Sequence, residues 1–170
     1  MKGADHEIRV VQSVIDRLID EEPRNSRDLL PTRADTVRAL RGAVQRDLDE
    51  LLNTRNSFAD LAPAFTKVRA SVIAYGLPDF STVGTRSDLD HNRLCQAIRK
   101  AIETFEPRLT DVSVTVVGTR DRPDRPWAPK DAVRIRIDAR LAMDPSPESV
   151  AFDVTLPVVS SHKVEVRERE

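Results

Sequence analysis

Apolar residues recur at helical spacing in three stretches of the chain, where they fall three and four residues apart. In residues 8–20 the apolar positions are Ile8, Val11, Val14, Ile15, Leu18 and Ile19. In residues 35–53 they are Val37, Leu40, Val44, Leu48, Leu51 and Leu52. A third stretch opens at Ser87, carries Leu94, Ile98, Ile102 and Phe105, and stops at Pro107. Each pattern predicts an amphipathic helix that packs one face against another part of the protein. A shorter helical piece is expected around residues 66–73, before a turn at residues 75–80.

Further along the chain, apolar and polar residues alternate, which is typical of strands with one buried face. The clearest alternation covers residues 133–141, and similar patterns occupy residues 112–117 and 150–156. A weaker one includes Val164 and Val166. Helices followed by strands predict an α+β fold in which N-terminal helices pack on one face of a three- or four-stranded, mainly antiparallel sheet.

Proline-containing segments suggest the boundaries between parts of the chain. Residues 21–28 are polar and contain Pro23, so they separate the first helix from the rest. We expect residues 1–30 to form a docking arm, residues 31–157 an α+β domain, and residues 158–170 a charged C-terminal strand or tail. Residues 119–131 have no periodicity and are expected to form a loop.

Composition excludes several classes of protein. The chain has 27 basic and 28 acidic side chains, so its net charge of −1 argues against DNA or an anionic membrane as a partner. Its single cysteine, Cys95, provides no internal disulfide. No uncharged stretch approaches the roughly 20 residues that cross a bilayer, and residues 1–7 do not resemble a signal peptide. We therefore expect a cytoplasmic protein without direct membrane insertion.

Metal, cofactor and thiol chemistry find little support in the sequence. His91 stands beside Asp88 and Asp90, but acidic residues in the first turn of a helix explain this group better than a metal site. Glycine-rich phosphate loops are absent, and Cys95 lies on an apolar helix face without a histidine that would activate it. We expect no metal, no cofactor and an inert thiol.

A basic strand face raises the alternative of RNA binding. Arg134, Arg136 and Arg140 share one face of the strand expected at residues 133–141. Sheet-based RNA binders stack bases on aromatic side chains of the exposed face, whereas Phe152 is in phase with the core positions of its strand. No nucleic-acid partner is expected.

Glu106 raises the alternative of a peptidoglycan-cleaving, lysozyme-like enzyme, because a glutamate beside the apolar Phe105 could act as a general acid. Arg108 would stabilise the charged carboxylate instead, and the sequence identifies no second carboxylate at catalytic distance. With one Trp and one Tyr, the chain also lacks the aromatic platforms of a carbohydrate cleft. We expect a protein that is not an enzyme.

Four separated strings carry a resemblance to a known family. They are SVIDRLID at residues 13–20, RDLDELLNTR at 46–55, YGLPDF at 75–80 and FEPRL at 105–109. In this order and spacing they resemble the TssE family, the type VI secretion baseplate subunits related to the phage T4-like tail wedge proteins. The resemblance covers roughly residues 13–157.

The resemblance implies a structural subunit of a cytoplasmic baseplate docked at the inner membrane. Such subunits join the wedge proteins TssF and TssG, reach TssK through the assembled wedge, and start polymerisation of the contractile TssB–TssC sheath. A closely related particle, the contractile phage-tail-like baseplate, uses the same type of subunit.

The resemblance also implies that Glu106, Pro107 and Arg108 dock on the wedge core bundle. At a helix end beside a proline, the two charged heads are expected to project as a pair toward a partner, the alternative being a local structural pair. Asn53 and Arg55 are further candidates, with helix capping as the equal alternative.

Two more contacts follow from the predicted elements. Val14, Ile15 and Leu18 form the apolar stripe of the N-terminal helix, which could dock on a wedge partner. An open edge of the sheet could accept extended arms of sheath subunits as added strands. The sequence does not indicate which strand forms that edge.

Overall fold

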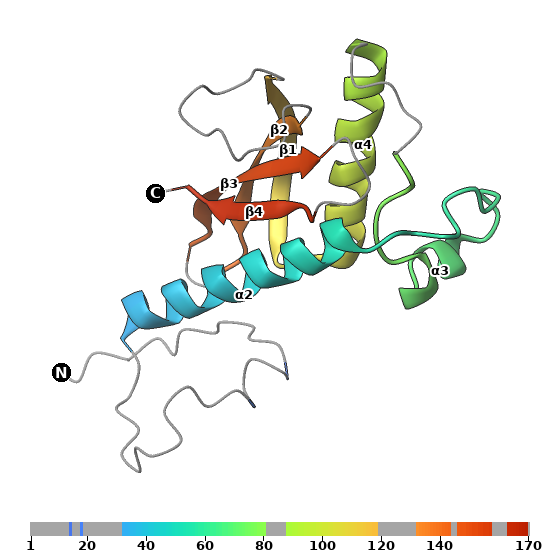
Figure 1. Ribbon diagram of the computed structural model, residues 1–170. Helices are drawn as coiled ribbons and strands as arrows, with labels where there is room; N and C mark the ends of the chain where they lie inside the picture. Colours follow the sequence, from blue (N-terminus) through green and yellow to red (C-terminus); the bar gives the residue numbers. More distant parts are fainter. Residues whose placement is uncertain are drawn as a thin grey trace.

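The computed structural model describes residues 32–80, 88–118, 132–143, 146–157 and 163–169, together with Val14 and Leu18. Its helices are α2 (Arg33–Asn53), α3 (Thr66–Arg69), the 3-10 helix η1 (Val72–Ala74) and α4 (Asp88–Phe105). The strands are β1 (Leu109–Gly118), β2 (Ala132–Leu141), β3 (Glu148–Pro157) and β4 (Glu165–Glu168). Helices followed by an antiparallel sheet confirm the α+β prediction (Figure 1).

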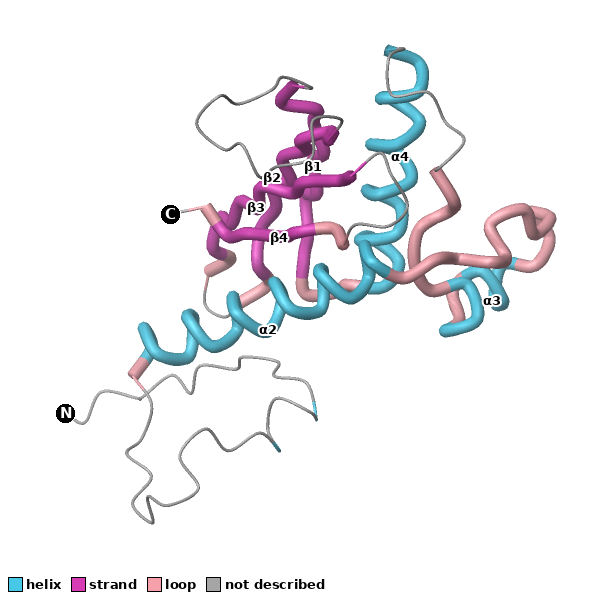
Figure 2. The backbone as a smooth tube through the Cα atoms, in the orientation of Figure 1, coloured by secondary structure: helices cyan, strands magenta, loops and turns pink. Residues whose placement is uncertain are grey.

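The four strands form one sheet in the order β1-β2-β3-β4, and each strand is antiparallel to its neighbours. The long helices α2 and α4 lie against one face of the sheet (Figure 2). The core lies between that face and the two helices, and Phe152, Ile137, Ile98 and Leu48 are fully buried in it. The stripes predicted for α2 and α4 therefore point inward, and the charged face of β2 points away from the helices.

Helix α2 begins at Arg33, two residues before the predicted start, because Thr32 and Asp35 form a capping box. The Thr32 hydroxyl accepts from the Asp35 backbone N–H at 3.2 Å, and the Asp35 carboxylate accepts from the Thr32 backbone N–H at 3.1 Å. The Thr32 hydroxyl also donates to the Asp35 carboxylate at 2.5 Å, and this bond, with the one from the Thr32 backbone N–H, lowers the pKa of Asp35. The reciprocal bonds satisfy donors that would otherwise be free at the helix end.

Strand β1 begins at Leu109, earlier than the predicted Val112, because a β-bulge interrupts the alternation. Asp111 adopts a left-handed backbone with φ of 52° at this bulge. The extra residue places both Leu109 and Val112 in the core although they are an odd number of residues apart. A simple two-residue period cannot detect such a strand start.

The helical piece expected at residues 66–73 is divided into α3 and η1. Ser71 separates them, because its backbone is extended with φ of −99° and ψ of 166°. The third predicted helix ends at Phe105 as expected, directly before Glu106 and Pro107. Leu109 N–H then donates to the Glu106 carbonyl at 3.1 Å, which turns the chain into β1.

Several predictions fall on residues outside the described parts of the chain. These include most of the N-terminal helix, the cap at Ser87 and the loop at residues 119–131, and the proposed part boundaries stay predictions. Val14 and Leu18 have helical backbone, and both side chains are exposed. None of the described helices has the length and apolar character that a membrane crossing would require.

Candidate functional site

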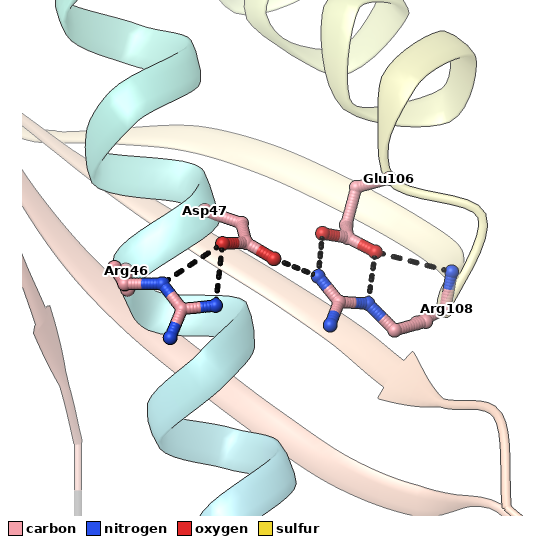
Figure 3. A network of polar contacts seen from close by, with 4 residues as sticks. All are labelled: Arg46, Asp47, Glu106 and Arg108. Carbon is pink, nitrogen blue, oxygen red and sulfur yellow. Dashed lines mark hydrogen bonds and ion pairs between the residues drawn. The ribbon is translucent and has the colours of Figure 1, made fainter. Parts of the chain in front are cut away.

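A polar network occupies the corner between α4 and β1 (Figure 3). The Arg108 side chain donates to the Glu106 carboxylate through both Nε, at 2.6 Å, and Nη2. Nη2 also donates to the carboxylate of Asp47 on α2. Arg46 donates to the same Asp47 carboxylate from Nε at 3.2 Å and Nη2 at 3.0 Å. The corner is therefore held to α2 by a chain of ion pairs in which arginine and carboxylate side chains alternate.

The network is turned into the protein. The Glu106 side chain is 6% exposed and that of Arg108 is 12% exposed. The hydrogen bonds that Arg108 donates to Glu106 raise the pKa of Arg108 above its ordinary value, and Asp47 adds to the effect against the opposing influence of burial. We expected Glu106 and Arg108 to project toward a partner, but the two side chains contact each other and α2. Their role in docking stays a prediction.

An apolar cavity of about 330 Å³ lies beside the network. It is lined by Asp47, Leu51, Tyr75, Phe105, Glu106, Pro107 and Arg108. The Tyr75 and Phe105 rings meet edge to face, with centroids 5.2 Å apart and planes at 68°. Burial raises the pKa of Tyr75, and the carboxylates of Glu50, Asp47 and Glu106 add to this effect. Pro107 is the exposed member of the predicted docking motif.

Sequence reasoning missed Asp47 as a member of the site and treated Tyr75 as part of the fold alone. Asp47 lies next to Leu48 and one turn before Leu51, so it stands at the border of the apolar stripe of α2. A carboxylate at such a border position is half-buried when the stripe packs, and it then needs a cationic partner. The position of Asp47 on α2 therefore predicts that its carboxylate has a cationic partner, but it does not predict that this partner is Arg108.

Asn53 holds strand β4 to the end of α2. Its side-chain amide donates to the Val164 carbonyl at 3.0 Å, and its side-chain oxygen accepts from the Val164 backbone N–H at 2.8 Å. Earlier in α2, the Gln45 side chain donates to the Val166 carbonyl at 3.0 Å. Side chains of α2 therefore bind backbone groups of β4 that point away from β3.

Ion pairs also join α2 to β3, to β4 and to the residues just before β4. Lys163 lies 2.7 Å from Asp49, and Arg41 lies 2.5 Å from Glu148 and 3.0 Å from Glu168. Because β4 lies alongside α2, this edge of the sheet is covered (Figure 1). The C-cap of α2 is Thr54 and not Asn53, which is the last helical residue and also donates to the Asp49 carbonyl at 2.6 Å.

Arg55 lies away from this contact and from the corner network. It forms an ion pair with Asp79 at 2.6 Å, and its side chain is 71% exposed. Its backbone forms a parallel bridge with Leu77. Arg55 therefore stands at the surface where residues 75–80 return to the end of α2.

The opposite edge of the sheet, β1, borders an open groove of about 650 Å³. The groove is lined by His91, Asn92 and Cys95 of α4 and by residues 114–118 of β1. The Val116 backbone points into it, because it hydrogen-bonds to Cys95. Burial raises the pKa of the Cys95 thiol despite that bond, so the thiolate is disfavoured.

The charged face of the sheet carries both signs. Arg136 lies 3.5 Å from Asp153, and Arg140 lies 3.7 Å from Asp111. Phe152 is fully buried on the other face, as its phase predicted. The described strands therefore offer no aromatic side chain on which a base could stack.

The corner gives no support to the hydrolase alternative. Both Glu106 oxygens accept hydrogen bonds from Arg108, so the carboxylate is engaged within the protein. The structure does bring a second carboxylate near, that of Asp47, but Arg108 stands between the two. Within the parts of the chain that the structure describes, no cluster of His, Cys, Asp and Glu is arranged to bind a metal.

Comparison with known proteins identifies the family. Residues 38–146 match the family described as baseplate wedge protein gp25, and this match runs from within α2 to just past the end of β2. Comparisons with curated proteins and with solved structures give no match. The family is one of structural proteins and is the one to which TssE belongs. The chain belongs to the baseplate wedge protein gp25 family and is a component of a phage-tail-like baseplate.

Proposed function

We propose that this chain is the wedge subunit of a type VI secretion baseplate that joins the TssF–TssG wedge to the TssB–TssC sheath and starts sheath polymerisation. The four strings that resemble TssE support this assignment, and the family match supports the baseplate. In this proposal the baseplate is cytoplasmic and docked at the inner membrane, and TssK is reached through the assembled wedge.

Wedge docking is proposed at the corner of Glu106, Pro107 and Arg108. The apolar cavity between Tyr75, Phe105 and Pro107 offers space for an apolar side chain of the partner. The buried pair of Glu106 and Arg108 keeps the corner rigid, which lowers the entropic cost of docking. Arg55 is exposed and can add a polar contact, whereas Asn53 acts through β4.

Sheath initiation is proposed at the β1 edge. The observation that carries it is the difference between the two edges: α2 binds backbone groups of β4, while an open groove remains between β1 and α4. Because backbone groups alternate along a strand, Val114 points its N–H and carbonyl to the same side as Val116, away from β2. An extended arm of a sheath subunit can pair with the backbone groups of Val114 as an added strand, whereas the Val116 backbone is already bonded to Cys95.

Val114→Pro tests this edge. Proline removes the outward N–H while leaving the pairing to β2 in place, which edge strands tolerate. We expect this variant to capture TssF and TssG as the wild type does. The resulting baseplates should form no TssB–TssC sheath, as scored by electron microscopy. Val114→Ala is the matched control, because it shortens the same side chain and keeps the N–H; it should support sheath assembly.

The outcomes separate the parts of the proposal. Loss of both wedge capture and sheath assembly in Val114→Pro, or loss of neither, contradicts a sheath contact at β1. Failure of the folded wild-type chain to capture TssF and TssG from the same genome contradicts the secretion-system assignment. Capture by phage-type wedge proteins in their place would assign the chain to a phage-tail-like particle.

The N-terminal stripe is proposed as a further wedge contact. Val14 and Leu18 are 73% and 78% exposed, and Ile15 belongs to the same predicted stripe. We expect the double variant Val14→Asp and Leu18→Asp to weaken wedge capture about tenfold, because charge replaces apolar contact, without a change in melting temperature. A large fall in melting temperature would show that the stripe packs on its own domain.

A further inference from the structure

Residues 56–74 form a lobe that leaves the domain at the end of α2 and returns to it at Tyr75; we call it the apolar lobe. Its base is closed by two backbone hydrogen bonds, from Asn56 N–H to the Leu77 carbonyl at 2.7 Å and from Leu77 N–H to the Thr54 carbonyl at 2.9 Å. The Asn56 side chain also donates to the Ala74 carbonyl at 2.8 Å. The lobe carries α3 and extends away from the sheet (Figure 1). Compact loops with pinned ends frequently serve in recognition.

The apolar lobe exposes large hydrophobic side chains. Phe58 is 49% exposed, Phe65 54%, Val72 83% and Ile73 55%. Helix α3 buries none of its residues, and η1 buries only Ala74. Elsewhere in the described parts of the chain, large exposed hydrophobic side chains are scattered singly or belong to the N-terminal stripe. A concentration of this kind on a charged surface marks an interaction site.

Hydrogen bonds hold the shape of the lobe although it has little core. Phe65 N–H donates to the Ala62 carbonyl at 3.0 Å, and Arg69 N–H donates to the Phe65 carbonyl at 3.0 Å. The Arg69 side chain donates to the Leu61 carbonyl at 3.1 Å. The two exposed phenylalanines are thus carried on a preformed backbone, and a partner need not order it on binding.

Charge and position indicate what the lobe binds. Lys67 and Arg69 lie in the last turn of α3, and Asp60 is the one acidic residue of the segment, which gives a local charge of 2 − 1 = +1. A partner surface with carboxylates beside apolar side chains complements this pattern. Two basic residues are fewer than the four to eight that typically bind an anionic membrane. A protein is the better match.

The lobe adjoins the corner cavity. Helix η1 ends directly before Tyr75, and the Tyr75 ring packs on Phe105 and lines the cavity beside Pro107. We propose that the apolar lobe is a second contact for the wedge partner, binding a surface on which apolar side chains meet Phe58 and Phe65 and carboxylates meet Lys67. This inference rests on the proposed wedge function, and it extends the docking surface beyond the corner.

Capture of the full-length chain by TssF and TssG tests the lobe. The double variant Phe58→Ser and Phe65→Ser should be captured at least about tenfold more weakly than wild type, because aromatic anchors dominate such contacts. Lys67→Glu should weaken capture severalfold, with a stronger effect at low salt. Val117→Ser, a matched truncation of an exposed residue on β1, should be captured like wild type. Melting temperatures should stay within a few degrees of wild type, since the altered side chains are exposed.

A comparison variant separates the failure of this inference from that of the proposed function. Pro107→Asp places a charge at the mouth of the corner cavity. If it loses capture while the lobe variants are captured like wild type, the lobe inference is overturned and corner docking stands. A folded wild-type chain that is not captured contradicts both. Lobe-dependent sedimentation with anionic vesicles, or lobe-dependent self-association, without any effect on wedge capture would also overturn the lobe as a wedge contact.

Discussion

Arg108→Ala is expected to destabilise the domain by about 3 kcal/mol or more, since it removes the cation from a largely buried ionic network. Glu106, 6% exposed, would lose both side-chain donors and keep only the backbone N–H of residue 108, 3.3 Å from its Oε1, and Asp47 would lose its link to the corner. An uncompensated buried carboxylate costs more than the intact pair contributes. Thermal unfolding should show a melting temperature lowered by roughly 10 °C.

An exposed ion pair provides the control for this variant. Arg55→Ala removes the pair with Asp79, in which the arginine side chain is 71% exposed, so stability should change by less than about 1 kcal/mol. Arg108→Lys should fall between the two, because an ammonium keeps the charge but cannot form the forked contact. An Arg108→Ala protein as stable as the Arg55→Ala protein would contradict a structural role for the network.

Because Arg108→Ala is expected to lower the stability of the domain, a loss of wedge capture in this variant can come from a loosened corner as well as from a lost contact. Pro107 is exposed, so substitution there alters the docking surface with less effect on the buried network. Capture experiments on the corner therefore need the melting temperature of every variant beside them.

Gly76→Ala is expected to cost about 3 kcal/mol or more in the free energy of unfolding. Gly76 has a φ of 106°, which residues with a side chain rarely adopt, and a Cβ there would lie 2.3 Å from the Thr54 carbonyl oxygen. That oxygen accepts the Leu77 hydrogen bond at the base of the apolar lobe. The backbone must therefore separate at this point to admit a methyl group, which urea unfolding would detect as a lower midpoint.

Gly42→Ala is the matched control, and its effect should have the opposite sign. Gly42 lies within α2, and a Cβ there would meet nothing within 4 Å. Alanine should stabilise the helix by about 0.5–1 kcal/mol, because it has less conformational freedom to lose than glycine. A Gly76→Ala protein with wild-type stability would show that the base of the lobe is not held as closely as the structure indicates.

Periodicity predicted the elements well where their apolar faces are regular. The stripes of α2 and α4 and the alternation in β2 all lie in the core as expected, and the α+β class followed from their order. The errors lie where local chemistry interrupts a period. The capping box extends α2 to Arg33, and the bulge at Asp111 extends β1 to Leu109. A sequence pattern averages over such single-residue features.

The candidate site was predicted less completely than the fold. The motif of Glu106, Pro107 and Arg108 was found from the sequence, but the direction of its charged side chains was not. Arg108 turns inward because Asp47, sixty-one positions earlier in the chain, lies beside it in the packed domain. Asn53 contacts Val164, which is 111 positions away. No local pattern records pairs at such separations.

The sequence by itself determined the helices and strands, a sheet with helices on one face, the near-neutral charge and the motifs that place the chain in its family. Those properties depend on the spacing of residues along the chain, which the sequence states directly. Only the tertiary structure decided that the corner charges face inward, that β4 is covered while β1 borders a groove, and that the apolar lobe stays exposed. These depend on which distant surfaces meet when the helices pack on the sheet, because a side chain is buried or left open by its neighbours in space.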